Sequence, residues 1–308
     1  MTNSPLVIGS RGSALALWQA RHIAQCLADL GAETRIEIIH TSGDKIQDVP
    51  LAKVGGKGLF IKEIEEALLA GQIDLAVHSM KDVPTEVPAG LALTAIPERE
   101  EPRDALIGLA LGELQPGTRV GTSSLRRSAQ LQAHIPGLSI QMLRGNVDTR
   151  LRKLDEGQYD AIVLAAAGLR RLGWHQRIRE LLPVEIVCPA VGQGALAIET
   201  RDDGGVAQAL ALKLDHAPTR RTVTAERALL RTLGGGCQVP VGAHAVLIDG
   251  PKGGGLSLRA VVASPDGTRL IRGELSGDAP EDLGAMLGEQ LLLQGAREIL
   301  AEVYAAAP

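Results

Sequence analysis

The chain has 308 residues, of which 45% are hydrophobic and 22% are charged, and its formal net charge is −4. This length predicts two or three domains of ordinary soluble, globular composition. The acidic balance and an aromatic content of 2% argue against a protein that stacks nucleic-acid bases, so we expect no nucleic-acid partner.

The three cysteines, Cys26, Cys188 and Cys237, lie far apart and form no C-x-x-C pair. Neither a disulfide framework nor a structural zinc site is indicated, and we expect no metal. The amino-terminal residues do not resemble a signal peptide, and no apolar run is long enough to span a bilayer. We therefore expect a cytoplasmic protein without a membrane partner.

The first hundred residues alternate between strand and helix patterns. The stretch 6–31 is predicted to form a short strand, a Gly/Ser turn and an amphipathic helix that ends at Gly31. A strand that enters a polar loop is predicted within 34–44, a second amphipathic helix at 59–71, and further strands at 73–80 and 91–96. Such alternation predicts right-handed crossovers and a largely parallel sheet.

The charged, proline-bounded segment 97–104, "PEREEPRD", is typical of a hinge or a domain boundary. Strand-to-helix units then restart at 119–134, 139–157 and 160–173, and a helix is predicted at 222–233. The last stretch differs, because strand patterns at 242–248 and 256–276 enclose an S-P-D-G turn and precede a long amphipathic pattern at 279–306. We expect a small antiparallel sheet covered by helices.

Three predicted strand-to-helix junctions combine small residues with arginine: "GSRGS" at 9–13, "GTSSLRR" at 121–127 and "LRGNVDTR" at 143–150. Backbone N–H groups, hydroxyls and guanidinium groups converge there on any bound anion. For one such junction, ordinary helix capping is the better explanation. Three junctions together favour a polyanionic ligand at the carboxyl ends of the strands.

Two further residues have chemistry that a solvent-exposed surface does not require. Asp82 follows the predicted strand at 73–80 and lies beside Lys81, which indicates a ligand that also carries a cation or N–H donors; a turn-forming aspartate is the alternative. Cys237 lies in the loop "LGGGCQVPVG", where we expect its thiol to face a cleft; a loop cysteine without function is the alternative.

In their order along the chain, these motifs resemble those of the porphobilinogen deaminase (hydroxymethylbilane synthase) family. The resemblance rests on "GSRGSALALWQA", "LAKVGGKGLFIKE", "AVHSMKDVPT", "GTSSLRR", "LRGNVDTRL", "PAVGQGALAIE", "TAERA" and "GGGCQVPVG", and it is weakest after about residue 245. It implies an α/β fold of three domains. The first two (1–98 plus 193–212, and 99–192) would resemble the lobes of type II periplasmic binding proteins, and the third (216–308) would be a small α+β domain with an antiparallel sheet.

The resemblance also implies a reaction. The family is a transferase that joins four porphobilinogen molecules head to tail on a covalently bound dipyrromethane cofactor, releasing ammonia, and then hydrolyses the chain to hydroxymethylbilane in tetrapyrrole and haem biosynthesis. A monomer with a small-molecule substrate is implied.

The family's functional positions carry over residue by residue. Cys237 would hold the cofactor through a thioether, and Asp82 would be the catalytic carboxylate. The cofactor-binding positions are Ser13, Lys81, Asp82, Thr122, Ser123, Ser124, Arg126, Arg127, Arg144 and Gly145. The substrate-binding positions are Arg11, Ser13, Gln19, Ser79, Arg144, Arg150, Arg171 and Gln193. A mobile covering loop would include Lys53, Lys57 and Phe60.

One position departs from the family pattern, because Ser42 stands where arginine is more usual. Two other functions compete with the enzyme. A non-catalytic anion-binding protein of the same two-lobed architecture would explain the arginine junctions but would leave Asp82 and Cys237 without a role. An RNA-binding module is disfavoured by the net charge and the scarce aromatic residues.

Overall fold

The computed structural model describes residues 4–45, 61–235, 239–249 and 254–305. The chain forms two compact units. The first takes its described residues from Met1–Gln47, Gly56–Glu100 and Ala195–Arg220, and the second from Asp48–Gly55, Glu101–Gly194 and Arg221–Pro308. The chain passes from the first unit to the second between Glu100 and Glu101. This point lies within the segment 97–104, which the sequence predicts to be a boundary. The finer division into three domains stays a prediction.

The first unit contains a five-stranded sheet in the order β2-β1-β3-β10-β4. Its strands are β1 (Leu6–Ser10), β2 (Thr34–Ile38), β3 (Leu75–Ser79), β4 (Leu91–Ala95) and β10 (Leu196–Arg201). Four strands run parallel, as the sequence predicts, while β10 is antiparallel to both of its neighbours. This returning strand places its first residue, Leu196, opposite the last residue of β3, Ser79.

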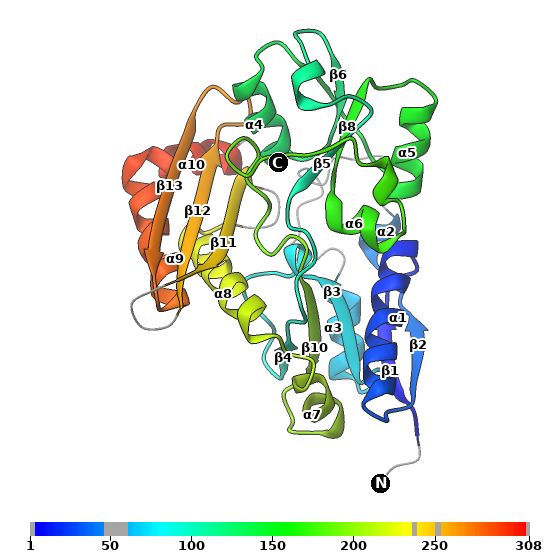
Figure 1. Ribbon diagram of the computed structural model, residues 1–308. Helices are drawn as coiled ribbons and strands as arrows, with labels where there is room; N and C mark the ends of the chain where they lie inside the picture. Colours follow the sequence, from blue (N-terminus) through cyan, green and yellow to red (C-terminus); the bar gives the residue numbers. More distant parts are fainter. Residues whose placement is uncertain (1–3, 46–60, 236–238, 250–253, 306–308) are drawn as a thin grey trace. The chain divides into compact units, whose positions relative to one another are not determined.

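Helices cover both faces of this sheet (Figure 1). They are α1 (Ala14–Asp29), α3 (Lys62–Leu69) and α7 (Val206–Leu212), and the short α2 (Ser42–Lys45) follows β2. One apolar core joins α1 and α7 to the sheet, and a second core joins α3 to the opposite face. Because both of its faces are buried, the strand β1 is almost entirely apolar, and β3 is apolar over its first three residues, whereas the edge strand β2 alternates and is partly exposed.

The second unit repeats this layout in a sheet of order β7-β6-β8-β5-β9. Its strands are β5 (Asp104–Ile107), β6 (Arg119–Gly121), β7 (Ser139–Gln141), β8 (Ala161–Ala165) and β9 (Glu180–Leu181). Here β5 is the antiparallel strand, and its first residue, Asp104, is opposite Ala165 at the end of β8. The amino end of β5 therefore lies at the edge where the parallel strands β6 and β8 end.

Three helices pack on this sheet: α4 (Leu125–His134), α5 (Val147–Asp155) and α6 (Ala166–Arg171). One core lies between the sheet and α5 and α6, and another lies between the sheet and α4. Each helix follows a strand directly, so the amino ends of α4, α5 and α6 gather at the carboxyl edge of the sheet.

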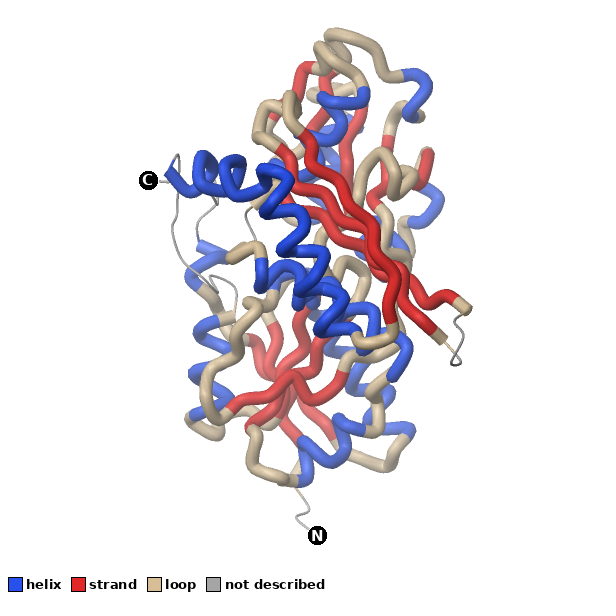
Figure 2. The backbone as a smooth tube through the Cα atoms, turned by 90° about the vertical axis from the view of Figure 1, so that its left-hand side faces the viewer, coloured by secondary structure: helices blue, strands red, loops and turns tan. Residues whose placement is uncertain are grey.

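The carboxyl-terminal part contributes the predicted antiparallel sheet, in the order β11-β12-β13. Its elements are β11 (Val241–Ile248), β12 (Gly255–Ala263), β13 (Leu270–Gly277), α8 (Ala217–Thr232), α9 (Pro280–Leu291) and α10 (Arg297–Ala305). Figure 2 shows helices lying along one face of this sheet, where they bury a common apolar core.

The predicted helix at 279–306 is interrupted, since Gly295 has a φ of 106° and separates α9 from α10. No helix in the described segments is both long and apolar enough to cross a membrane.

Candidate active site

The predicted site residues fall into two groups, one at the carboxyl edge of each five-stranded sheet. The first unit holds Arg11, Ser13, Gln19, Ser79, Lys81 and Asp82, and the second holds Thr122, Ser123, Ser124, Arg126, Arg127, Arg144, Gly145, Arg150, Arg171 and Gln193. Four predicted residues, Lys53, Lys57, Phe60 and Cys237, lie outside the described residues.

In the first unit, helix α1 begins directly at a predicted anion-binding junction. Ser13 is the N-cap of α1, and its Oγ accepts a hydrogen bond from the Ala16 N–H at 3.3 Å. The capping bond uses a lone pair of the hydroxyl and not its hydrogen, so capping leaves Ser13 able to donate to an anion. The half-buried Arg11 lies two residues earlier on the same turn.

The end of β3 positions the predicted catalytic aspartate. Ser79 Oγ accepts a hydrogen bond of 2.9 Å from Nε2 of the buried Gln19. A single 3₁₀ turn over Met80–Asp82 follows, anchored by the buried Met80 side chain and by its N–H, which donates to Ala195 O at 3.0 Å. Asp82 is exposed, and its carboxylate accepts no hydrogen bond from any described residue. An anchored turn thus presents an uncommitted carboxylate at the sheet edge.

Buried ionisable groups lie on the α3 face of the same sheet. His78 Nε2 lies 3.0 Å from Glu199 Oε2, and both side chains are almost completely buried. The second oxygen of Glu199 is buried and has no hydrogen-bond partner among the described residues. Burial, and next the negative charge of Glu199, raise the pKa of Glu65 on α3 to about 7. Sequence reasoning gave these residues no role, since their partners come from separate strands and a helix.

In the second unit, the junction between β6 and α4 uses its hydroxyls locally. Ser124 is the N-cap of α4, and its Oγ accepts from the Arg127 N–H at 3.4 Å. Thr122 Oγ1 accepts from the Ser124 N–H at 3.1 Å, and Ser123 Oγ donates to Leu143 O at 2.7 Å. These bonds fix the loop in one conformation, with the backbone N–H groups of the first turn of α4 at the sheet edge.

The two arginines that follow are buried and share one carboxylate. Arg126 Nη1 donates to Asp104 Oδ2 at 2.7 Å, while Arg127 Nε and Nη2 donate to Asp104 Oδ1 at 2.9 and 2.7 Å. Complete burial raises the pKa of Asp104, but the charges of Arg126 and Arg127 outweigh this effect and hold the pKa well below its usual range. Sequence reasoning missed Asp104, because it ends the charged segment 97–104; the only signal was the apolar run that begins immediately after it.

The third junction brings more positive charge to this edge. Arg150 Nε donates to Gly145 O at 2.8 Å, and no carboxylate of the described residues pairs with Arg150. Partial burial, followed by the like charges of Arg127 and Arg144, lowers the pKa of Arg150 to about 10. Gly145 has a φ of 114°, a conformation that favours glycine, and a Cβ there would lie 2.8 Å from Thr149 Cγ2.

Two predicted substrate-binding residues join this network. Gln193 is 1% exposed, and its Nε2 donates to Asp104 Oδ1 at 2.9 Å and to Pro102 O at 2.7 Å. Arg171 Nη2 donates to Gly194 O at 2.6 Å. The structure therefore brings Gln193 to the same carboxylate as the two arginines and brings Arg171 to the adjacent backbone.

The charge balance at the second edge determines what it can bind. Arg126 and Arg127 are buried against a single carboxylate, Asp104, and the half-buried Arg150 adds a positive charge that acts on Arg127. Burying an uncompensated cation costs several kcal/mol, so this excess of positive charge suits a ligand with several carboxylates or phosphates. No group of three or more His, Cys, Asp or Glu side chains among the described residues is arranged to hold a metal ion.

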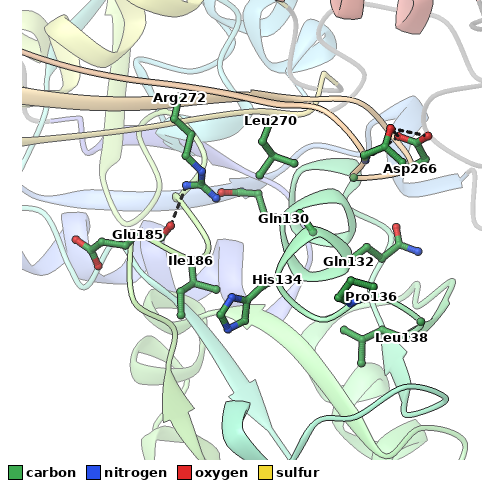
Figure 3. Close-up of a pocket in the computed structure, with 14 residues that line it drawn as sticks. Gln130, Gln132, His134, Pro136, Leu138, Glu185, Ile186, Asp266, Leu270 and Arg272 are labelled. Atoms are coloured by element: carbon green, nitrogen blue, oxygen red, sulfur yellow. Dashed lines mark hydrogen bonds between the residues drawn. The ribbon is translucent and has the colours of Figure 1, made fainter.

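A separate hollow of about 610 Å³ lies on another part of the second unit and contains none of the predicted residues (Figure 3). Arg272 on β13 reaches the Glu185 carbonyl at its wall, at 2.8 Å. Gln130, also at the wall, accepts from the Cys188 N–H at 2.8 Å and donates to Cys188 O at 3.2 Å. This wall therefore holds the Cys188 carbonyl, which also accepts from Arg126 Nη1 at 2.5 Å.

Comparison with known proteins identifies similar chains. Family models described as "Porphobilinogen deaminase, dipyromethane cofactor binding domain" and "Porphobilinogen deaminase, C-terminal domain" match residues 6–209 and 220–293. A porphobilinogen deaminase of Thiobacillus denitrificans is 54% identical over 96% of this chain and 97% of its own length. That of Syntrophobacter fumaroxidans is 51% identical over 99% and 100%. Among solved structures, a periplasmic substrate-binding protein of an ABC transporter from Coxiella burnetii matches 72% of this chain and 94% of its own, with a TM-score of 0.42 and 12% identity.

Proposed function

This chain belongs to the porphobilinogen deaminase family, and on that premise we propose that Asp82 is its catalytic carboxylate, that Cys237 carries the dipyrromethane cofactor, and that the arginine-rich edge of the second unit binds the ligand's carboxylates. The family's enzymes are transferases of tetrapyrrole biosynthesis. The observation that carries the site assignment is the contrast between an uncommitted carboxylate at one sheet edge and an excess of buried cations at the other.

The charge at the second edge fits such a cofactor. Each pyrrole ring derived from porphobilinogen carries an acetate and a propionate, so a growing chain accumulates carboxylates. The proposed ligands for these groups are Thr122, Ser123, Ser124, Arg126, Arg127, Arg144, Gly145, Arg150, Arg171 and Gln193, together with Arg11, Ser13, Gln19, Ser79 and Lys81 of the first unit. Guanidinium groups and helix-terminal N–H groups are the donors that bind carboxylates most strongly.

Asp82 is suited to stabilising positive charge on pyrrole nitrogens. Its carboxylate accepts no hydrogen bond from the described residues, so its oxygens remain available to N–H groups of a substrate. An ionised carboxylate placed where positive charge develops lowers the barrier of that step. The same oxygens can move a proton to the departing amine. The buried Met80 restricts the turn that presents Asp82, which keeps the carboxylate in place.

The cofactor, when bound, supplies the pyrrole carbon to which the first substrate is joined. Cys237 would hold it through a thioether, a role that requires some thiolate when the bond forms. The loop that contains Lys53, Lys57 and Phe60 is proposed to cover the site. We also propose a cytoplasmic location, which the lack of paired cysteine motifs supports, and a monomer, as the family resemblance implies. The three-domain division given above is supported by the apolar core of the antiparallel sheet, which is separate from the two cores of each five-stranded sheet.

Intact-protein mass spectrometry tests the attachment site. The purified chain is expected to be heavier than its sequence by two linked pyrrole units, and Cys237→Ser is expected to remove that excess. Cys26→Ser is the matched control, since this half-buried thiol lies in helix α1 and should leave the mass excess intact. A chain without added mass that nevertheless turns over porphobilinogen at full rate would overturn the proposal. A bare chain that binds anions without turnover would indicate the non-catalytic alternative.

A further inference from the structure

We propose that Asp104 is a positioning residue for the carboxylate-binding arginines: it aligns Arg126, Arg127 and Gln193 from behind, so that the remaining N–H groups of both guanidiniums face the ligand. This inference rests on the proposed function of that edge. It adds a residue that neither the sequence motifs nor the comparisons indicate.

Asp104 accepts four hydrogen bonds from side chains of the second unit. Its Oδ1 accepts from Arg127 Nε, Arg127 Nη2 and Gln193 Nε2, and its Oδ2 accepts from Arg126 Nη1, all at 2.7 to 2.9 Å. Both carboxylate oxygens are therefore already engaged by side chains of the protein. Asp104 is also fully buried. Its effect on a ligand must therefore pass through the residues that it holds.

Each guanidinium retains unused donors. Arg126 Nη1 donates to both Asp104 Oδ2 and Cys188 O, and its Nε and Nη2 have no acceptor among the described residues. Arg127 donates through Nε and Nη2 to Asp104 and through Nη1 to Val163 O at 3.2 Å, which leaves one N–H on each of its two terminal nitrogens. The held geometry thus offers each ligand carboxylate a guanidinium that is already oriented.

A purely structural ion pair does not account for this arrangement. One carboxylate compensates one arginine, whereas here two buried arginines occupy the first turn of α4, where the helix dipole already disfavours cations. Arg150 adds a further positive charge without a carboxylate partner among the described residues. A bound anion would compensate the remaining positive charge. Asp104 compensates only part of that charge and holds the guanidinium groups in place.

The position of Asp104 follows from the topology. It is the first residue of the antiparallel strand β5, opposite Ala165 at the end of β8. The returning strand is therefore the element that can bring a buried carboxylate behind the amino end of α4. A residue at the other end of β5 would lie at the opposite edge of the sheet.

The experiment compares Asp104→Asn and Asp104→Glu with Asp160→Asn. Asp160 is the control, because it also pairs with an arginine side chain, that of Arg119, but lies partly exposed at the amino edge of the same sheet. For each variant we would measure thermal unfolding, the number of covalently bound pyrroles by intact mass, and KM and kcat for porphobilinogen.

We expect Asp104→Asn to raise KM about 30-fold, equivalent to about 2 kcal/mol, and to lower the fraction of chains that carry the two-pyrrole unit. Asp104→Glu keeps the charge but displaces it by one methylene group, so we expect a rise in KM of about tenfold with kcat changed much less. Asp160→Asn should leave KM and pyrrole occupancy as in the unmodified chain, whatever it does to unfolding.

Wild-type KM and full pyrrole occupancy in a folded Asp104→Asn protein would overturn the inference. If Asp104→Asn does not fold, Asp104→Glu decides, and an unchanged KM there has the same meaning. Arg127→Leu separates this inference from the proposed function. If Arg127→Leu is impaired while both Asp104 variants are normal, only the positioning role fails; if Arg127→Leu is also normal, the proposed carboxylate-binding edge fails.

Discussion

The two five-stranded sheets have the same strand layout, but the charged residues at their carboxyl edges differ in burial and in partners. In the first unit, the exposed Asp82 stands at the edge with no hydrogen bond from a described residue. In the second, the fully buried Asp104 is surrounded by Arg126, Arg127 and Gln193. The carboxylate of Asp82 therefore has no bound partner among the described residues, whereas that of Asp104 is bound to two arginines.

Each sheet also has a buried acid, and the two acids differ in their partners. Asp104 is paired with two arginines, which hold its pKa well below the usual range despite its burial. Glu199 in the first unit is fully buried and has only His78 as an ion-pair partner among the described residues. The surplus negative charge there contributes to the raised pKa of Glu65. The same strand layout therefore carries different arrangements of buried charge in the two units.

Replacing the available aspartate is expected to have the largest effect. Asp82→Asn should lower kcat about 10³-fold, because it removes the charge that stabilises developing positive nitrogen. Unfolding should shift by less than about 0.5 kcal/mol, since the exposed carboxylate accepts no hydrogen bond from described residues. Steady-state kinetics and thermal unfolding would measure both.

Glu86→Gln is the control for Asp82→Asn, because Glu86 is an exposed carboxylate four residues further along the chain. Its kcat should stay within about twofold of the unmodified chain. Equal losses in the two variants would mean that general negative charge near this edge, rather than Asp82 itself, supports turnover.

The next largest effect is expected from changing the backbone conformation of the loop 143–150, which carries Arg144 and Arg150. Gly145→Ala should destabilise the protein by about 3 kcal/mol and raise KM about tenfold, because a Cβ would be strained at a φ of 114° and would press on Thr149 at 2.8 Å. Gly31→Ala has a positive φ of 83° but no neighbour within 4 Å of the added Cβ. We expect about 1 kcal/mol and no change in KM for that control. A normal KM for Gly145→Ala would exclude loop shape as a determinant of substrate binding.

The smallest expected effect concerns Glu65, the half-buried acid on helix α3 of the first unit. The folded-state pKa of Glu65 is raised to about 7 from 4.5, so its protonated form stabilises the fold below about pH 4.5, and that contribution is lost as the pH rises to 7. Glu65→Gln should therefore stabilise the protein by about 1 kcal/mol at pH 8, after allowance for solvent screening of a half-buried group, and by nothing at pH 4.

Thermal unfolding at the two pH values would measure this difference. The exposed neighbour Glu66 on the same helix is the control, because Glu66→Gln should give no gain that depends on pH in this way. A pH-independent effect of Glu65→Gln would show that packing, and not ionisation, is responsible.

Much of the fold and part of the candidate site could be predicted from local patterns. Strand-to-helix alternation, capping residues and the junctions containing Arg126, Arg127 and Arg150 are features of neighbouring residues, and the structure confirms the alternation and the helix starts. Asp82 was also recognisable, because the end of an apolar strand determines where the next polar residue lies. The family resemblance is confirmed by the comparisons.

The sequence by itself thus determined the elements, their caps and the arginine junctions, since these depend on periodicity and on hydrogen bonds within a few residues. Only the tertiary structure decided which charges meet. Gln193 and Asp104 are 89 residues apart, and His78 and Glu199 are 121 residues apart. Both meetings depend on the antiparallel strands β5 and β10, whose place in each sheet is set by long-range strand pairing rather than by any local pattern.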